Sequence, residues 1–180
     1  MNVPEEQAAT FMHTFKARYK GISKFIEKTI TFCRREGYVS TIMRRKRLLP
    51  NIRSTSTRLR NHAERQAINT TVQGSAADLV KIAMINIHNR INKMYLGDNQ
   101  LHGNSMHHCL SSTANFQWKP KLVLQLHDEL LFEVKQKDLD SLASIVKQEM
   151  ESALKLRVKL NVKVKAGRCW GELTHYTCSS

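Results

Sequence analysis

Residues 122–134, LVLQLHDELLFEV, contain two apolar runs separated by His127, Asp128 and Glu129. The two runs predict antiparallel β-strands that form a hairpin within residues 121–134, with the polar residues at its tip. Burying a carboxylate is costly unless it is paired or binds a metal, so the tip is where the two acids can reach the rim of the sheet. A carboxylate held there suits a divalent cation that also contacts phosphate. The alternative is an ordinary turn, in which such residues are common.

The segments around the hairpin predict a mixed α+β fold. Residues 61–94 have an apolar stripe at helical spacing and predict one long helix, and residues 138–154 predict a second. In the stretch LRVKLNVKVKAG, apolar and polar residues alternate, which predicts a final amphipathic strand. The residues expected on its apolar face are Leu156, Val158, Leu160, Val162 and Val164.

Residues 97–119 differ in composition from the rest, being polar, rich in Ser, Asn and His, and without periodicity. We interpret them as an exposed, disordered insertion. A zinc site there is one alternative, although the spacing of its candidate ligands suits no common zinc site. Those candidates are His102, His107, His108 and Cys109. The four cysteines are far apart in the sequence and fit free thiols in a reducing compartment, the cytosol or the nucleus.

The charge balance points to a polyanionic partner. The 180 residues include 29 Lys and Arg against 15 Asp and Glu, a formal net charge of +14. Nucleic acid is the first candidate partner and an anionic membrane surface the second. No apolar run is long enough to span a bilayer, so we expect no membrane insertion. A nuclear protein that is basic throughout is the alternative.

Positive charge is densest in residues 38–60, which we expect to be strand or loop because Pro50 breaks a helix. Within it, TIMRRKRLLP has four consecutive cations, each able to contact a phosphate without reading sequence. These cations are Arg44, Arg45, Lys46 and Arg47. The same run could instead be a nuclear localisation signal or a solvated charge cluster.

In AERQAINTTVQGSAAD, residues 63–78, Arg65, Asn69 and Gln73 are spaced by four and share one helical face. Such a ladder of hydrogen-bond donors can reach the acceptors of the DNA minor groove, which are nearly alike in every base pair. It would therefore check base-pair geometry without reading sequence. The alternative is a solvated polar face. The small residues at 74–77 allow another helix or a nucleic-acid backbone to approach closely.

Three stretches, in this order, resemble the C-terminal part of a family A DNA polymerase. They are GYVSTIMRRKRLLP, ERQAINTTVQGSAAD and LQLHDELLFEV, and the closing VKQEMESALKLRVKLNVKVKAGRCWGEL extends the resemblance over roughly Val3 to Leu173. The resemblance implies that residues 1–180 form part of a polymerase domain: a partial palm, with the hairpin and the final strand, covered by fingers and other helices. It also implies template-directed DNA synthesis in DNA repair, in the nucleus.

The resemblance implies a role for each candidate residue. Asp128 would bind catalytic Mg²⁺ with support from Glu129, and His127 would lie near the primer terminus. The metal ions would activate the primer 3′ hydroxyl and stabilise the leaving pyrophosphate. The residues implied to contact DNA are Arg65, Asn69 and Gln73 in the minor groove, and Arg45, Lys46 and Arg47 in the basic motif. The family pattern has glycine where this chain has Arg44, which leaves the turn at that position in doubt.

The resemblance also implies partners and missing parts. Primer–template DNA and deoxynucleoside triphosphates are the expected partners. The family's other metal-binding aspartate and its nucleotide-binding helix come earlier in the family pattern than the first residue here, so we expect a fragment with an incomplete nucleotide site. A non-catalytic DNA-binding module, which keeps the ladder and the basic motif without the chemistry, is the alternative function.

Overall fold

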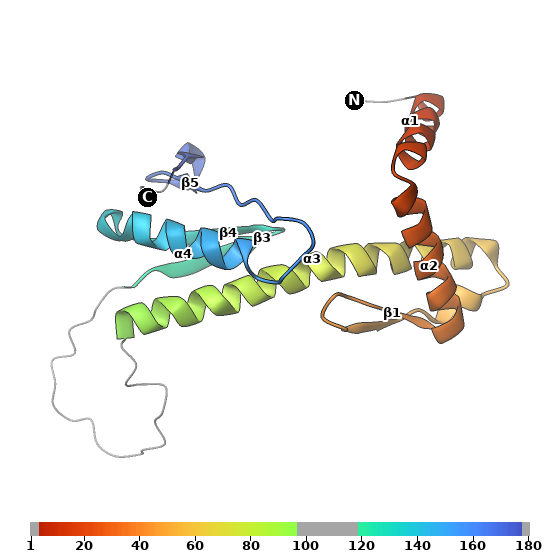
Figure 1. The fold of residues 1–180 in the computed structure, drawn as a ribbon, viewed down its shortest axis with the longest axis horizontal. Coiled ribbons are helices and arrows are strands. Elements are labelled where there is room, and N and C mark those ends of the chain that lie inside the picture. Colours follow the sequence, from red (N-terminus) through yellow and green to blue (C-terminus); the bar gives the residue numbers. More distant parts are fainter. Residues whose placement is uncertain (1–3, 97–118, 178–180) are drawn as a thin grey trace, which may run out of the picture. The chain divides into compact units, whose positions relative to one another are not determined.

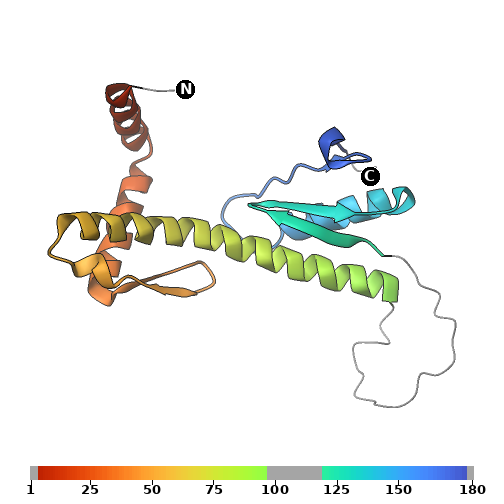
Figure 2. The ribbon, with the colours of Figure 1, turned by 180° about the vertical axis from the view of Figure 1, so that it is seen from behind.

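The computed structural model describes residues 4–96 and 119–177 (Figures 1 and 2). The chain divides into two compact units, Met1–Asp78 and Leu79–Ser180. The long helix α3 (Thr57–Leu96) contributes residues to both units. The described residues form helices and small antiparallel strand pairs, which confirms the predicted α+β class.

The first unit consists of helices and one short hairpin, followed by the first part of α3. Its other elements are α1 (Glu5–Arg18), α2 (Lys20–Glu36), β1 (Tyr38–Ser40), β2 (Lys46–Leu48) and the 3₁₀ helix η1 (Pro50–Arg53). Helix α2 ends because Gly37 adopts φ 81°, a left-handed conformation that glycine reaches without steric cost. The Gly37 N–H donates to the Cys33 carbonyl at 2.7 Å. The chain then turns directly into β1.

The core of the first unit joins α2, the hairpin and α3. Its buried residues are Cys33, Val39, Leu49, Ile52, Ala63 and Ala67. Ala63 and Ala67 are one turn apart on α3, and their small side chains let neighbouring elements approach the helix closely. Figures 1 and 2 show the β1–β2 hairpin running along α3. Its register pairs Val39 with Arg47, so the two side chains lie on the same face of the hairpin; the short Val39 is buried in the core, whereas the longer Arg47 stays exposed.

The second unit contains the rest of α3 and the predicted hairpin. Its other elements are β3 (Lys121–Leu126), β4 (Glu129–Glu133), η3 (Gln136–Asp138), α4 (Leu139–Glu151), β5 (Lys165–Ala166), η4 (Trp170–Glu172) and β6 (Thr174–His175). Leu126 pairs with Glu129, so the loop of the hairpin is the two residues His127 and Asp128, and Glu129 is the first residue of β4. A register shift between Leu122 and Leu124 forms a bulge in β3.

The predicted apolar stripe of α3 is confirmed. Ala83, Ile87 and Ile91 are buried at successive turns of the helix. They form one cluster with Leu142 of α4 and with Ala153, and Leu130 and Phe132 of β4 are among the side chains packed against it. Arg90 on α3 donates from Nη1 to Gln148 Oε1 at 2.7 Å and to Glu149 Oε1 at 2.8 Å on α4.

Two predictions of secondary structure were wrong. Residues 57–60 belong to the first turn of α3, not to a strand or loop. Residues 156–164 do not form the predicted strand; ladder pairing begins only at β5. A strand needs a partner for its backbone N–H and C=O groups, and among the described residues only the Tyr176 N–H, which donates to the Val164 carbonyl at 2.9 Å, extends the β5–β6 pairing into 156–164. The N–H of Val162 donates instead to Glu151 Oε1, and Val158 is 71% exposed.

Candidate nucleic-acid interface

The predicted ladder lies on the exposed face of α3. Arg65, Asn69 and Gln73 are all exposed, whereas Ala63 and Ala67 are buried in the core of the first unit. Helical geometry therefore presents the three polar side chains in a row, about 6 Å apart along the helix axis. The predicted shared face is confirmed, while the role of these residues in DNA binding stays a prediction.

The basic motif lies on β2 and on the loop that precedes it. Arg45, Lys46 and Arg47 are exposed. Arg47 donates from Nη1 to Thr70 Oγ1 on α3 at 2.9 Å, which aligns the strand with the helix. Lys46 Nζ lies 4.6 Å from the centroid of the Tyr38 ring, a cation–π contact across the hairpin.

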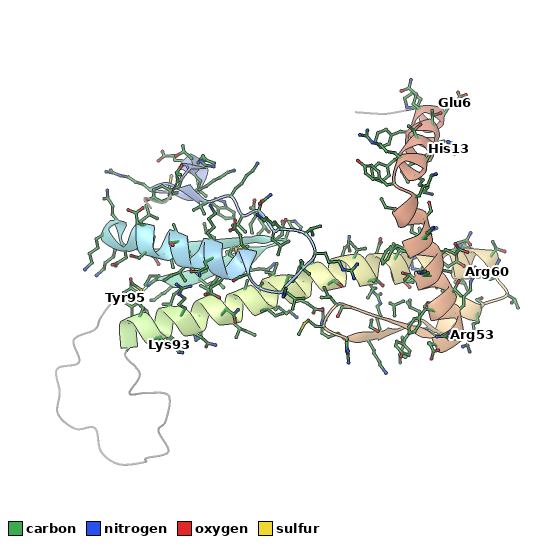
Figure 3. The ribbon with its side chains drawn as sticks, viewed as in Figure 1. Glu6, His13, Arg53, Arg60, Lys93 and Tyr95 are labelled. Carbon is green, nitrogen blue, oxygen red and sulfur yellow. The ribbon has the colours of Figure 1, made fainter. Side chains whose placement is uncertain are left out.

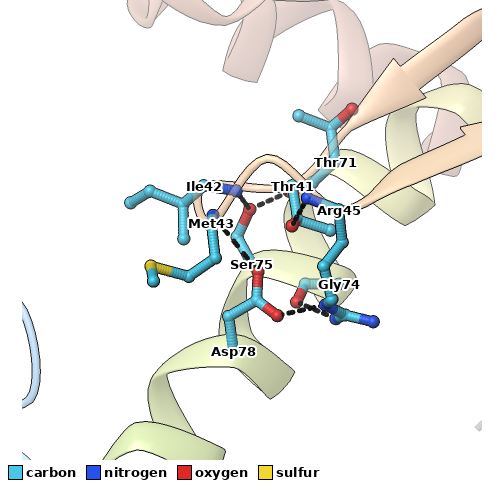
Figure 4. Close-up of polar contacts among 8 residues, drawn as sticks. All are labelled: Thr41, Ile42, Met43, Arg45, Thr71, Gly74, Ser75 and Asp78. Atoms are coloured by element: carbon cyan, nitrogen blue, oxygen red, sulfur yellow. Dashed lines mark hydrogen bonds and ion pairs between the residues drawn. The ribbon is translucent and has the colours of Figure 1, made fainter.

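The loop between β1 and β2 is bound to one turn of α3 (Figure 4). Ile42 N–H donates to Ser75 Oγ at 2.8 Å, and Met43 N–H donates to Asp78 Oδ2 at 3.3 Å. Arg45 donates from Nε to Asp78 Oδ1 at 2.5 Å and from Nη2 to the Gly74 carbonyl at 3.1 Å. The loop thus donates hydrogen bonds to three residues of this helical turn, Gly74, Ser75 and Asp78.

Gly74 is required where the loop meets the helix. A Cβ atom at this position would lie 2.7 Å from Thr41 Cγ2, closer than real contacts allow. Thr41 is itself 7% exposed and has little space to move. Gly74 therefore allows close approach of the β1–β2 loop to α3, where the sequence predicted another helix or a nucleic-acid backbone.

Asp78 is the functional candidate that the sequence analysis missed. Its side chain is 4% exposed. Burial by itself would raise the pKa of Asp78, but hydrogen bonds from Thr41, Arg45 and the Met43 N–H, together with the charge of Arg45, hold it below its ordinary value. The carboxylate is therefore a stable anion inside the unit. The available signal was an acid directly before the apolar Leu79, at the edge of the buried stripe.

Arg44 adopts φ 61°, the left-handed conformation that glycine prefers. This is the position where the family pattern has glycine, so the expected departure at this turn is real. The turn is closed by a hydrogen bond from the Arg44 N–H to the Thr41 carbonyl at 2.9 Å. The conformation is strained for an L-residue.

A groove of about 360 Å³ lies between the basic hairpin and the ladder. It is lined by Thr41, Arg45, Lys46, Arg47, Asn69, Thr70, Gln73 and Gly74. The structure thus brings together all three residues of the basic motif and two residues of the ladder. Arg65 is on the same helix face but does not line the groove.

A second hollow in the first unit, of about 440 Å³, lies at the end of α2, where its arginines bind backbone carbonyls. It is lined by Arg34, Ile52, Arg53, Ser54 and Arg60. Arg53 donates from Nε to the carbonyl oxygen of Arg34 at 2.6 Å, and Arg60 donates from Nη1 to the carbonyl of Ser54 at 3.2 Å. Figure 3 labels Arg53 and Arg60 near the end of α2. These bonds satisfy backbone carbonyls at the end of α2 and before α3.

The hairpin tip in the second unit presents the three residues predicted there. His127, Asp128 and Glu129 are exposed. His127 has φ 54°, which closes the two-residue loop, and Gln125 Nε2 donates to the His127 carbonyl at 2.5 Å. Within residues 4–96 and 119–177, no hydrogen bond or ion pair engages the carboxylate of Asp128 or Glu129, and no group of three or more metal-ligating side chains occurs.

Other predictions fall outside the described residues. The insertion at 97–119 is described only at Lys119, and the alternative zinc ligands of that segment are not described at all. In the part of the chain that the structure covers, no helix is both long enough and apolar enough to cross a membrane.

Comparison with known proteins relates the chain to DNA polymerases. A profile of DNA polymerase family A matches residues 1–172. The chain is 45% identical to DNA polymerase theta of Mus musculus over 98% of its own length, and 37% identical to DNA polymerase I of Caldicellulosiruptor bescii over 96%. It spans only 7% and 18% of the lengths of these two relatives.

A solved structure gives the same relationship. The chain is similar to the POL domain of Pol1 from M. smegmatis, in a complex with DNA primer–template and dNTP, with a TM-score of 0.69 and 33% identity. The match covers 87% of this chain and 24% of the other. The profile match over most of the sequence shows that this chain belongs to DNA polymerase family A.

Proposed function

We propose that this chain is the part of a template-directed DNA polymerase that tracks the newly formed duplex and contributes a carboxylate pair to the metal site. The observation that carries the proposal is the groove in which Lys46 and Arg47 face Asn69 and Gln73. Cations there neutralise phosphates, and the carboxamides reach minor-groove acceptors. The groove therefore suits duplex DNA of any sequence. The similarity to a polymerase domain bound to primer–template supports the proposal.

The ladder supplies the check on base-pair geometry. Arg65, Asn69 and Gln73 offer hydrogen-bond donors in a row on a helix whose opposite face is buried. The acceptors adenine N3 and thymine O2 occupy nearly the same place in each correct pair, and a mismatch displaces them. Contacts from a rigid helix are lost when the acceptor moves. The ladder thus favours correctly paired duplex.

The hairpin tip is the proposed metal-binding part. Enzymes of this family generally use divalent metal ions. The exposed carboxylate oxygens of Asp128 and Glu129 are the hard donors that Mg²⁺ prefers, and they have no other partner among the described residues. We assign the ion to Asp128, supported by Glu129, with His127 beside the primer terminus. Bound Mg²⁺ supplies activation of the primer 3′ hydroxyl and stabilisation of the leaving pyrophosphate.

The remaining assignments follow from the family. Primer–template DNA and deoxynucleoside triphosphates are the proposed partners, and DNA repair in the nucleus is the proposed setting. The similarity to DNA polymerase theta of the mouse supports both. The excess of 29 Lys and Arg over 15 Asp and Glu also favours a nucleic-acid partner.

DNA binding is tested by fluorescence anisotropy with a labelled primer–template across a salt series. Arg47→Gln should reduce the slope of log affinity against log salt by about 1, because one phosphate contact is lost. Arg58→Gln is the matched control, since Arg58 is equally exposed on α3 but does not line the groove. Gln73→Ala should weaken binding by about 1 kcal/mol, the value of one hydrogen bond. Binding that is independent of salt, or equal in Arg47→Gln and Arg58→Gln, contradicts the proposal.

Metal binding at the tip is tested without any activity. Titration with Mn²⁺ should broaden the backbone NMR signals of Asp128 and Glu129 first, and Mg²⁺ should compete. Asp128→Asn should remove the effect. Glu133→Gln, an exposed acid at the opposite end of the same hairpin, should leave it unchanged. Equal broadening in the two variants would show that the ion associates with surface acids in general.

A further inference from the structure

We infer that Asp78 is a positioning residue that holds the basic loop against α3, and that Arg45 acts as its tether rather than as a phosphate contact. The inference deepens the proposed function and rests on it, because the groove that the tether builds is the proposed DNA site.

Both carboxylate oxygens of Asp78 are used, and they hold opposite sides of one turn. Oδ2 accepts from the Met43 N–H and Oδ1 from Arg45 Nε. The residue between these two anchors is Arg44, at φ 61°. A turn that is strained by itself is therefore fixed at both sides by one anion with 4% exposure.

Arg45 has a second bond that determines the position of the loop along the helix. Its Nη2 donates to the Gly74 carbonyl at 3.1 Å, so one guanidinium spans the helical turn between Gly74 and Asp78. Ser75 Oγ accepts from the Ile42 N–H at 2.8 Å on the same turn. These contacts prevent the loop from sliding along or lifting off α3.

The position of the loop decides the geometry of the groove. Lys46 and Arg47 directly follow the tethered residue, and they line the groove opposite Asn69 and Gln73. The charge of Arg45 is already paired with a buried carboxylate, so it contributes little to phosphate attraction. The Arg45–Asp78 pair therefore fixes the positions of Lys46 and Arg47, and these two residues provide the positive charge of the groove.

The sign of one substitution separates this role from a general electrostatic effect. Asp78→Asn raises the net charge by one, and charge alone would tighten binding to DNA. The inference expects the opposite, an affinity for primer–template about fivefold lower, because Lys46 and Arg47 are no longer held opposite the ladder. The matched control is Glu64→Gln, which removes a carboxylate paired with Arg34 outside the groove. This control should bind DNA as tightly as the wild type or more tightly.

A second variant covers the case in which Asp78→Asn fails to fold, as circular dichroism would show. Arg45→Lys preserves the charge but cannot reproduce the forked contact to Asp78 and Gly74. It should lower affinity about threefold at unchanged salt slope, since a hydrogen bond is lost without a phosphate contact. The double variant Arg45→Lys/Asp78→Asn should bind DNA no less tightly than whichever single variant binds less tightly. The reason is that both substitutions break the same contact, so their effects do not add.

The outcomes distinguish the inference from the proposed function. If wild-type protein shows no salt-dependent DNA binding, the proposed function fails and the inference fails with it. If wild-type protein binds but Asp78→Asn behaves as Glu64→Gln does, or Arg45→Lys binds as the wild type, only the inference is overturned. A salt slope reduced by about 1 in Arg45→Gln, which removes the charge, would return Arg45 to the phosphate contacts and would also overturn the inference.

Discussion

Replacing Arg44 by glycine is expected to stabilise the first unit. Arg44 has φ 61°, and an L-residue in this region is strained by roughly 1–2 kcal/mol, whereas glycine adopts it freely. The side chain is exposed and makes no hydrogen bond or ion pair with the described residues, so its removal forfeits little. The gain is a direct consequence of backbone geometry.

The expected magnitude is the relieved strain less the greater flexibility that glycine gives the unfolded chain. Glycine lowers stability through the unfolded state by about 0.5–1 kcal/mol, which leaves a net gain of about 0.5–1 kcal/mol. Urea unfolding followed by circular dichroism measures the difference. With a slope of about 2 kcal/mol per molar urea, the midpoint should rise by about 0.4 M.

Arg44→Ala is the control that isolates the backbone effect. It removes the same side chain and the same charge as Arg44→Gly but keeps a Cβ atom, so the strain should persist and the midpoint should not rise. If Arg44→Ala stabilises as much as Arg44→Gly, relief of charge repulsion explains the gain. If Arg44→Gly lowers the midpoint, the reasoning from φ is refuted.

Three further predictions concern packing, pH and activity. Gly74→Ala should lower the free energy of unfolding by about 1–3 kcal/mol, because its Cβ would overpack against Thr41. Urea unfolding measures the effect, with Gly21→Ala as the control because its Cβ meets nothing within 4 Å. Equal effects of the two substitutions would contradict the close contact at Gly74. Because the folded-state pKa of Asp78 is lowered, its contribution to stability is present above the unfolded pKa of about 3.9 and is lost as pH falls through the folded value. In Asp78→Asn, the free energy of unfolding should therefore fall less steeply below about pH 4 than in the wild type. The same steepness in both proteins would argue against this role of Asp78. This chain alone should not extend a primer with Mg²⁺ and all four deoxynucleotides, since the described residues hold no group of three metal-ligating side chains. Extension that disappears in Asp128→Asn would refute this prediction.

Local patterns were sufficient to predict α3, α4 and the β3–β4 hairpin. The spacing of Ala83, Ile87 and Ile91 indicated the buried face of α3, and the two apolar runs of residues 121–134 indicated the hairpin. The exposed face with Asn69 and Gln73 also followed from helical periodicity. These features depend on residues close together in the sequence, where period and burial are coupled.

Features that depend on distant partners could not be predicted in the same way. The alternation in residues 156–164 is typical of a strand, but a strand forms only where another edge accepts its backbone hydrogen bonds. Asp78 contacts residues 35 and 33 positions earlier, so no local pattern identifies its partners. The sequence placed Arg45 among DNA contacts because it is a cation in a basic run, and only the fold reveals its pairing.

Cys33 gives the first unit an intrinsic reporter of its own opening. The thiol is 0% exposed, and burial raises its pKa, so little reactive thiolate forms while the unit is closed. A maleimide or disulfide reagent can modify Cys33 only after local or global unfolding, and its rate of modification measures how often that core opens. Exposed Cys169 reacts from the native state and serves as an internal standard. Mass spectrometry of the two peptides would follow local opening of the first unit in the unaltered sequence, with no introduced probe.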